Sequence, residues 1–290
     1  MTAALVFALP FVAFAQIAPP GDQLPADTIK PSTATTGSTD LDESVFAAGN
    51  AAKEATEQYA TEGSISLGGL FASGNARTIA LTSAGKLRVR RYESQLTFAA
   101  AWNFARSAKA GESAAVTNVE NYQGLGRYDL FLTPHISLFL QSTVRRDRFQ
   151  GLDFRLNVDP GFAYHFIQTT NQRLVGEVGY DLQYDIRRDE DRFAVMPPIP
   201  KTRTLHDARA FLGYENKLYT EVSFIASLEY LQNFEDAQLY RLIFDTGLES
   251  TIRGRLAVAA TYTMRYENKP LPGIEKADSL ASIALVYTLF

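Results

Sequence analysis

The chain has 290 residues, enough for two soluble domains or one large β-barrel, and its 28 basic and 32 acidic residues form no basic face, which argues against a nucleic-acid partner. It contains no cysteine, which excludes disulfides, thiol catalysis and cysteine-bound metals. Beyond the N-terminus no apolar run reaches the about 18 residues of a membrane-spanning helix, so a polytopic helical membrane protein is excluded as well.

Residues 1–15 are predicted to be a signal peptide. Residues 3–14 form a short apolar run, and "AFA" at 13–15 fits an A-x-A cleavage site. The usual basic residues before the apolar run are missing, since Lys30 is the first in the chain, and a buried N-terminal helix is the alternative. Residues 16–40 are rich in Pro, Thr, Ser and Gly, which predicts a disordered linker.

A short periplasmic helix is predicted over residues 41–62. Apolar residues recur there at spacings of three and four, Asp40 and Glu43 resemble a capping box, and Gly63 is a stop signal. The apolar face is thin and rich in Ala, which is typical of a docked or marginal helix. Such a helix could plug a barrel lumen or lie outside it as a spacer, and the sequence leaves both open.

Residues 63–290 have an apolar period of two, which predicts strands throughout. Residues 174–187, for example, place Val178 and Leu182 on one face and Asp181 on the other. Many of these runs exceed the about 5–6 residues usual in soluble strands and reach the about 9–11 of a tilted membrane-spanning strand. The predicted strands are 63–72, 76–89, 93–105, 117–131, 135–147, 152–166, 172–187, 203–215, 218–231, 237–249, 254–266 and 277–290.

The connections favour an all-β, antiparallel, up-and-down transmembrane barrel of about twelve strands. Long polar loops follow the third, seventh and eleventh strands, whereas every even-numbered strand is followed by a tight turn. Outer-membrane barrels have short periplasmic turns and longer outer loops. An even strand number then places both termini in the periplasm. A soluble exported β-sandwich is the alternative fold, but it has no reason to sort its loops in this way.

The expected surroundings follow from this fold. The terminal "SIALVYTLF" ends in Phe290, the type of closing residue that outer-membrane assembly machinery recognises, so this machinery is an expected partner during biogenesis. Outer-membrane lipid and lipopolysaccharide would surround the folded barrel. The charged run at 187–192 is interpreted as a solvated rim or a lipopolysaccharide and cation contact rather than an acid–base site.

Charged residues on one parity of the strands predict a wet lumen. Each would cost up to about 2–4 kcal/mol facing lipid at the membrane midplane, so this face must point inward. The predicted lumen-lining residues are Arg145, Asp147, Arg155, Asp159, Glu177, Asp181, Asp185, Arg187, Arg209, Glu221, Glu229, Arg241, Asp245, Glu249, Arg255 and Arg265. Twelve strands lie between a filled barrel and an open channel, so the sequence does not decide whether the lumen conducts.

Three segments resemble the exported proteins of the domain-of-unknown-function 481 family, some of which are described as salt-induced outer-membrane proteins. The segments are "GNA" at 74–76, "GRYDLFLTPHISLF" at 126–139 and "DRFQGLDFR" at 147–155. The residues that carry the resemblance are Arg127, Tyr128, Asp129, Asp147, Arg148, Phe149, Gln150, Gly151, Leu152 and Asp153. The resemblance implies an outer-membrane barrel over 63–290, without an established substrate or catalytic residue. Because the motifs lie at a turn end and a loop end, we expect structural roles for them.

Catalysis is not expected. A lipid hydrolase would need a Ser–His pair at the outer lipid boundary, and His206 could meet Ser142 or Ser227 only by coincidence of the strand map. The sequence shows no metal-ligand spacing and no phosphate-binding motif, so we expect no cofactor, metal or catalytic residue.

The predicted function is a role in envelope integrity or in the passage of small solutes or ions, with a link to salt or osmotic stress implied by the resemblance. A lipid-hydrolysing barrel and a non-conducting structural barrel are the alternatives. The sequence does not indicate a solute or an oligomeric state.

Overall fold

A computed structural model describes residues 59–72, 76–109, 114–148, 151–192, 199–270 and 276–289. All of these residues belong to one compact unit. The elements are β1 (Tyr59–Ala72), β2 (Ala76–Arg91), β3 (Ser94–Lys109), β4 (Val116–Thr133), β5 (Ile136–Asp147), β6 (Leu152–Gln168), β7 (Gln172–Arg187), α2 (Asp189–Arg192), β8 (Thr202–Lys217), β9 (Val222–Asn233), β10 (Tyr240–Arg253), β11 (Leu256–Glu267) and β12 (Ala277–Thr288). No helix in these ranges is both long and apolar enough to cross a bilayer.

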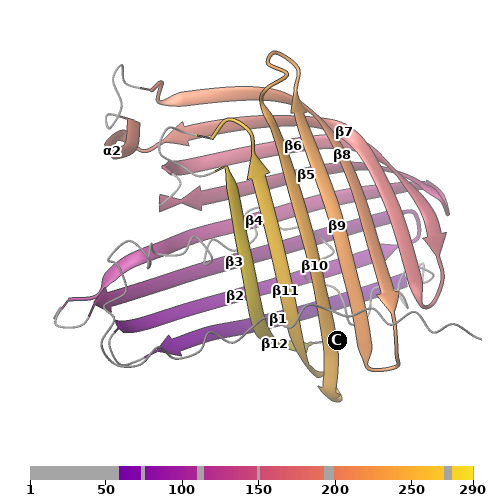
Figure 1. Cartoon of the computed structure of the whole chain (residues 1–290). Helices are drawn as coiled ribbons and strands as arrows, with labels where there is room; N and C mark the ends of the chain where they lie inside the picture. The colour runs from indigo at the N-terminus through magenta and orange to yellow at the C-terminus, as the bar shows by residue number, and fades with distance from the viewer. Residues whose placement is uncertain are drawn as a thin grey trace, which may run out of the picture. The chain divides into compact units, whose positions relative to one another are not determined.

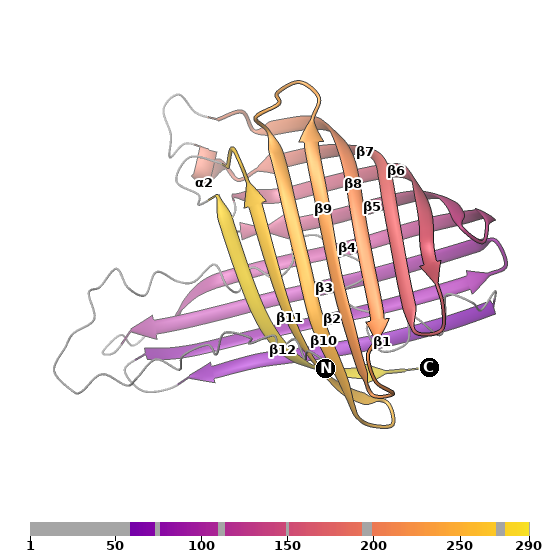
Figure 2. The same cartoon turned by 45° about the vertical axis from the view of Figure 1, so that its right-hand side comes forward.

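The twelve strands form one closed antiparallel barrel. Each strand pairs with its neighbours in the sequence, and β1 pairs with β12, with Ser66 opposite Val286. Strands β9–β11 pass in front of β2–β4 in both views and cross their direction, so these groups form facing parts of the barrel wall (Figures 1 and 2). The predicted all-β barrel of about twelve strands is confirmed.

Strict alternation sets the two faces of the wall. In β7, Glu177 and Asp181 are buried in the interior, whereas Val178, between them, points out and is exposed. Side chains of successive strand residues point to opposite faces of a sheet, so this pattern requires a polar inside and an apolar outside. An outward apolar band around a polar interior is the arrangement of outer-membrane barrels. The large exposed apolar residues include Ile65, Leu67, Leu81, Phe98, Leu140, Phe162, Val178, Leu212, Leu248, Ile283 and Leu285.

Connections differ between the two ends of the barrel. Even-numbered strands are followed by short turns at 92–93, 134–135, 169–171, 218–221 and 254–255. The connections after β3, β7, β9 and β11, at 110–115, 188–201, 234–239 and 268–276, are longer and all lie at the opposite end. Two of them are tied together by Lys269, whose ammonium donates to Asp236 at 2.8 Å and holds the pKa of that carboxyl below its ordinary value. The predicted sorting of the loops is confirmed.

Some boundaries of the secondary-structure elements differ from those predicted. Strand β1 begins at Tyr59, so residues 59–62 are strand rather than the end of the predicted helix. Glu62 pairs with Arg88 of β2 at 2.8 Å, and this contact favours the extended chain over another helical turn. The remainder of the predicted helix, the linker and the signal peptide lie outside the described residues.

Candidate functional site in the barrel lumen

The structure places fourteen of the predicted lumen residues on the inner face. Thirteen are buried, namely Arg145, Asp147, Arg155, Asp159, Glu177, Asp181, Asp185, Arg187, Arg209, Arg241, Asp245, Glu249 and Arg265. Glu229 is half-buried and accepts a hydrogen bond from Arg209. Glu221 and Arg255 do not belong to this set, because β9 and β11 begin later than predicted and leave both residues exposed in turns.

A chain of five charged side chains runs along the inside of β4, β7, β8 and β9. Arg127 binds Asp129 at 2.7 Å and Glu177 at 2.7 Å. Glu177 also accepts a hydrogen bond from Arg209 at 2.8 Å, and Arg209 bonds Glu229 in turn. The signs alternate along the chain, which contains three carboxylates and two guanidiniums. Arg127 and Glu177 belong to strands that are not neighbours, so this ion chain braces the curved wall from inside.

Aromatic side chains pack against the guanidiniums of this ion chain. The Arg127 guanidinium lies 4.2 Å from the ring centroid of Phe139, and that of Arg209 lies 5.6 Å from the same ring and 5.4 Å from Phe211. Gly161 makes room for this arrangement, because a Cβ there would lie 2.2 Å from Phe139 Cζ. Cation–π contact of this kind contributes about 0.5–2 kcal/mol, depending on desolvation.

A second polar cluster lies further along the inside of β6, β7 and β10. Asp185 accepts hydrogen bonds from Arg155 Nε at 2.7 Å and Nη2 at 2.8 Å, a bidentate pair. Gln183 donates to Asp185 at 3.0 Å and accepts from Arg241 at 2.8 Å. Arg241 lies on β10, three strands from β7, so this cluster also links strands that are not paired in the sheet.

The opposite part of the wall has a different lining, which we call the small-residue wall. Its members are the inward-facing Ser66, Gly68, Ala84, Ala101, Ala259 and Ala284 of β1, β2, β3, β11 and β12. All six are half-buried rather than buried. Inward-facing residues that keep part of their surface exposed border open space inside the barrel. The lumen is therefore more open beside these six residues, whereas inward-facing residues further along the same strands, such as Ala80, Arg88, Asn103 and Arg265, are buried.

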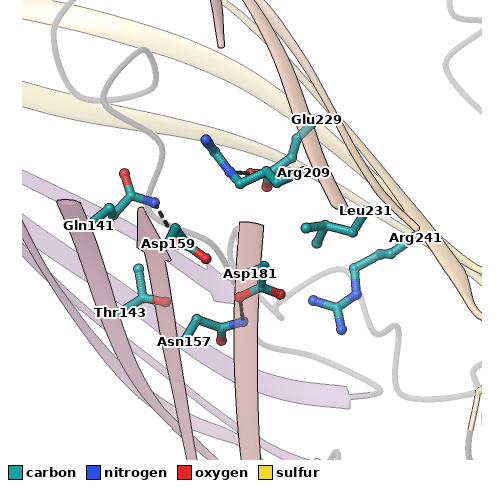
Figure 3. Close-up of a pocket in the computed structure, with 9 residues that line it drawn as sticks. All are labelled: Gln141, Thr143, Asn157, Asp159, Asp181, Arg209, Glu229, Leu231 and Arg241. Carbon is teal, nitrogen blue, oxygen red and sulfur yellow. Dashed lines mark hydrogen bonds and ion pairs between the residues drawn. The ribbon is translucent and has the colours of Figure 1, made fainter. Parts of the chain in front are cut away.

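A cavity opens within the charged part of the lumen (Figure 3). It is lined by Gln141, Thr143, Asn157, Asp159, Asp181, Arg209, Glu229, Leu231 and Arg241, and its empty volume, including space open to solvent, is about 270 Å³. Gln141 donates to Asp159 at 3.3 Å, and Asn157 donates to Asp181 at 2.7 Å. Water, a small ion or a small polar group fits the chemistry of this lining.

The family-motif residues divide into lumen and loop groups. Contrary to the expectation of a turn-end position, Arg127 and Asp129 lie within β4 as members of the ion chain, while Tyr128 points outward. Asp147 pairs with Arg145 at 2.6 Å on the inner face of β5.

The remaining motif residues lie at the β5–β6 connection. Gly151 adopts φ 69°, a left-handed conformation that favours glycine, and Leu152 is buried. Arg148 lies 3.7 Å from Glu120 of β4. Asp153 lies 3.9 Å from Arg188 of the β7–β8 connection. These contacts connect the β5–β6 connection to β4 and to the β7–β8 connection. Phe149 and Gln150 lie outside the described residues.

The lumen contains polar residues that the sequence prediction did not include. Gln141, Asn157 and Gln183 bridge the charged residues, and Phe139 supports them. Their inward orientation could have been predicted, because each lies an even number of residues from a predicted charged lumen residue on the same strand. The prediction counted only charged side chains and therefore missed them.

His206 meets neither Ser142 nor Ser227. His206 Nδ1 contacts the hydroxyl of Tyr180, and Ser142 donates to the carbonyl of Asn157 at 3.2 Å. Ser227 is buried on the inner face of β9, away from the lipid boundary that such an esterase requires.

A different Ser–His pair lies in the lumen near the short-turn end. Ser137 Oγ is 3.3 Å from His165 Nε2, and the imidazole stacks on Phe131 with ring centroids 5.4 Å apart. His165 Nδ1 is buried without a hydrogen-bond partner, so no carboxylate orients this imidazole. The pair therefore lacks the third group of a nucleophile–base–orienter set.

The barrel region matches a known protein family. A family model described as "Protein of unknown function, DUF481" matches residues 65–289. The chain belongs to the DUF481 family. The match covers nearly the whole region over which the resemblance was predicted and confirms it. No curated protein matches the chain.

Solved structures with similarity to this DUF481 chain include several barrels. The translocator domain of the autotransporter NalP from Neisseria meningitidis is 11% identical, covering 79% of this chain and 87% of that one, with a TM-score of 0.41. The NanC porin is 9% identical, covering 78% and 97%, with a TM-score of 0.43. The KdgM porin is 6% identical, covering 80% and 100%, with a TM-score of 0.41.

Proposed function

We propose that the protein is an outer-membrane barrel that lets small hydrophilic solutes or ions pass, with both termini in the periplasm. The observation that carries this proposal is the small-residue wall. Its members face inward yet stay partly exposed, so the interior beside them is open. An interior of this polarity suits water and hydrated solutes rather than apolar ligands.

The charged part of the lumen supports the same reading. Ion pairs hold Arg127, Glu177 and Arg209 against the β4–β9 wall, so these long side chains do not extend freely across the interior. The passage is then bordered by fixed charges of both signs on one side and by small side chains on the other. Rings and rows of such groups determine which ions cross a pore.

Membrane position and orientation are part of the proposal. The exposed apolar residues form the surface that lipid and lipopolysaccharide would contact, and the closed barrel leaves no unpaired strand edge in the bilayer. Short turns in the periplasm and long loops outside give the usual orientation of such barrels. Assembly machinery of the outer membrane is the partner proposed for biogenesis.

Two neighbouring alanines provide a matched test. Ala101 faces inward and Ala100 faces outward on the same strand, and the chain has no native cysteine. The variants A101C and A100C are refolded in detergent and inserted into planar bilayers, and a water-soluble charged thiol reagent is added. We expect steady single-channel current that falls on modification of A101C and is unchanged for A100C, because only Cys at 101 borders the passage.

Silent bilayers with a barrel shown to be folded by its heat-modifiable gel mobility would reject passage. That result would leave a structural role in envelope integrity. Repeating the measurement after deletion of residues 17–58, which leaves β1 intact, tests whether the N-terminal segment plugs the lumen or is only a spacer. Current that appears only after the deletion would identify the N-terminal segment as a plug.

A further inference from the structure

One guanidinium in the lumen has no hydrogen-bond acceptor. Arg90 lies next to the last residue of β2, faces inward and is 8% exposed. Among the residues that the structure describes, none accepts a hydrogen bond from its guanidinium or forms an ion pair with it, and its Nε is buried. The guanidinium stacks on Phe131 of β4, with Cζ 4.0 Å from the ring centroid. Because a buried charge without a hydrogen-bond partner is costly, this group favours an anionic partner.

A second guanidinium approaches Arg90 from another part of the wall. Arg173 is the second residue of β7, five strands from β2 around the barrel. The two residues lie close enough to repel each other, and both act on the charge of His165, which stacks on Phe131. Arg173 donates no hydrogen bond to the described residues, and its Nη1 lies 3.9 Å from Glu215 Oε1, beyond hydrogen-bond distance. Both guanidiniums therefore keep N–H donors that are available to a ligand.

The carboxylates nearest in the fold are engaged by other arginines. Glu62 accepts from Arg88 Nε at 2.9 Å and from Arg88 Nη2 at 2.8 Å. Asp129 lies near enough to attract Arg90, but it accepts hydrogen bonds from Arg127 Nε at 3.0 Å and from Arg127 Nη2 at 2.7 Å. Arg90 is therefore a surplus donor in a region where the other guanidiniums already have carboxylate partners.

We propose that Arg90 and Arg173 together bind an oxyanion, the carboxylate or phosphate group of a small hydrophilic solute. The planar fork of a guanidinium donates two parallel hydrogen bonds to either group. Two guanidiniums that repel each other are both stabilised by an anion between them. The short turns at 92–93 and 169–171 adjoin these residues, so the site lies at the short-turn end of the lumen. Binding here goes beyond passage, because it does not require that the barrel conducts.

Calorimetry and unfolding of the full chain in non-ionic detergent micelles test the proposal. Sodium phosphate and sodium acetate are each compared with sodium chloride at matched ionic strength. We expect a saturable heat and a saturable rise in the unfolding midpoint with at least one oxyanion and not with chloride, because a ligand that binds only the folded state stabilises it. The anion that binds more tightly identifies whether the site prefers a phosphate or a carboxylate group.

The variants R90M and R173M remove one guanidinium each and keep an aliphatic stem. Each should weaken oxyanion affinity by about tenfold or more, since bidentate charge-assisted hydrogen bonds are among the strong ones. R90K keeps the charge but not the fork, so its affinity should lie between those of R90M and the native chain. R253M is the matched control, because Arg253 is an exposed arginine at the same end of the barrel, in the last position of β10; its oxyanion affinity should be unchanged.

Three results would overturn the proposal. They are an equal response to chloride, unchanged affinity in both R90M and R173M, and an equal loss of affinity in R253M, which would indicate attraction by net charge alone. If R90M does not fold, R90K and R173M replace it, and unchanged affinity in both would also reject the site. Because these measurements need no bilayer, their outcome is independent of the test of passage.

Discussion

Removing Arg209 should strongly destabilise the barrel, because this residue holds two buried carboxylates. Its side chain is 5% exposed and bonds Glu177 at 2.8 Å as well as Glu229. The change R209M keeps the length of the aliphatic stem but leaves three carboxylates with one guanidinium in the ion chain. Breaking a buried ion pair by removing one partner costs about 3–5 kcal/mol, since the remaining charge is uncompensated.

The companion change E229Q should cost less. Glu229 is more exposed, at 14% for its side chain, and its removal leaves two carboxylates with two guanidiniums. Replacing one charge-assisted hydrogen bond by a neutral one costs about 1–2 kcal/mol. In the double variant R209M/E229Q the Glu229 charge that loses its Arg209 partner is absent. The double variant should therefore be more stable than the sum of the single changes implies, by about 1–3 kcal/mol.

Equilibrium urea unfolding in phospholipid vesicles measures these free energies. Trp102 is the single tryptophan and lies on the outer face of β3, so its fluorescence reports the loss of the lipid environment. Additive effects of R209M and E229Q would refute the ion chain as a coupled unit. So would a cost of R209M below that of E229Q.

Two further changes test the packing inside the wall and the lipid contact outside it. G161A should destabilise by about 1–3 kcal/mol, because its Cβ would lie 2.2 Å from Phe139 Cζ, whereas G85A, with its nearest atom at 3.8 Å, should be nearly neutral; equal costs in urea unfolding would contradict this packing. L140R should cost about 2–4 kcal/mol in vesicles if Leu140, which is 52% exposed and outward-facing, lies near the bilayer midplane. A cost near zero for L140R would mean that this face does not contact hydrocarbon.

Strand number, strand order and wall polarity were predictable because each depends on local pattern. A strand has a period of two, so the alternation of Val178 with Glu177 and Asp181 already separates an apolar from a polar face. Loop lengths are read directly from the spacing of these runs. The ends of the strands were predicted less accurately. Strand β1 begins at Tyr59, and Glu221 and Arg255 lie in turns. Pairing at a strand end depends on tertiary contacts such as that of Glu62 with Arg88.

Only the tertiary structure decided which polar residues meet. Arg127 and Glu177 are 50 positions apart and lie on strands that are not paired, so no local pattern joins them. Their contact depends on the shear and curvature of the closed barrel, which bring distant inner faces together. The same geometry places Asp159 and Asp181 in one cavity, whereas Asp185, four residues along from Asp181, is bound by Arg155. Sequence determined that these side chains point inward, and the closure of the barrel determined the partner of each.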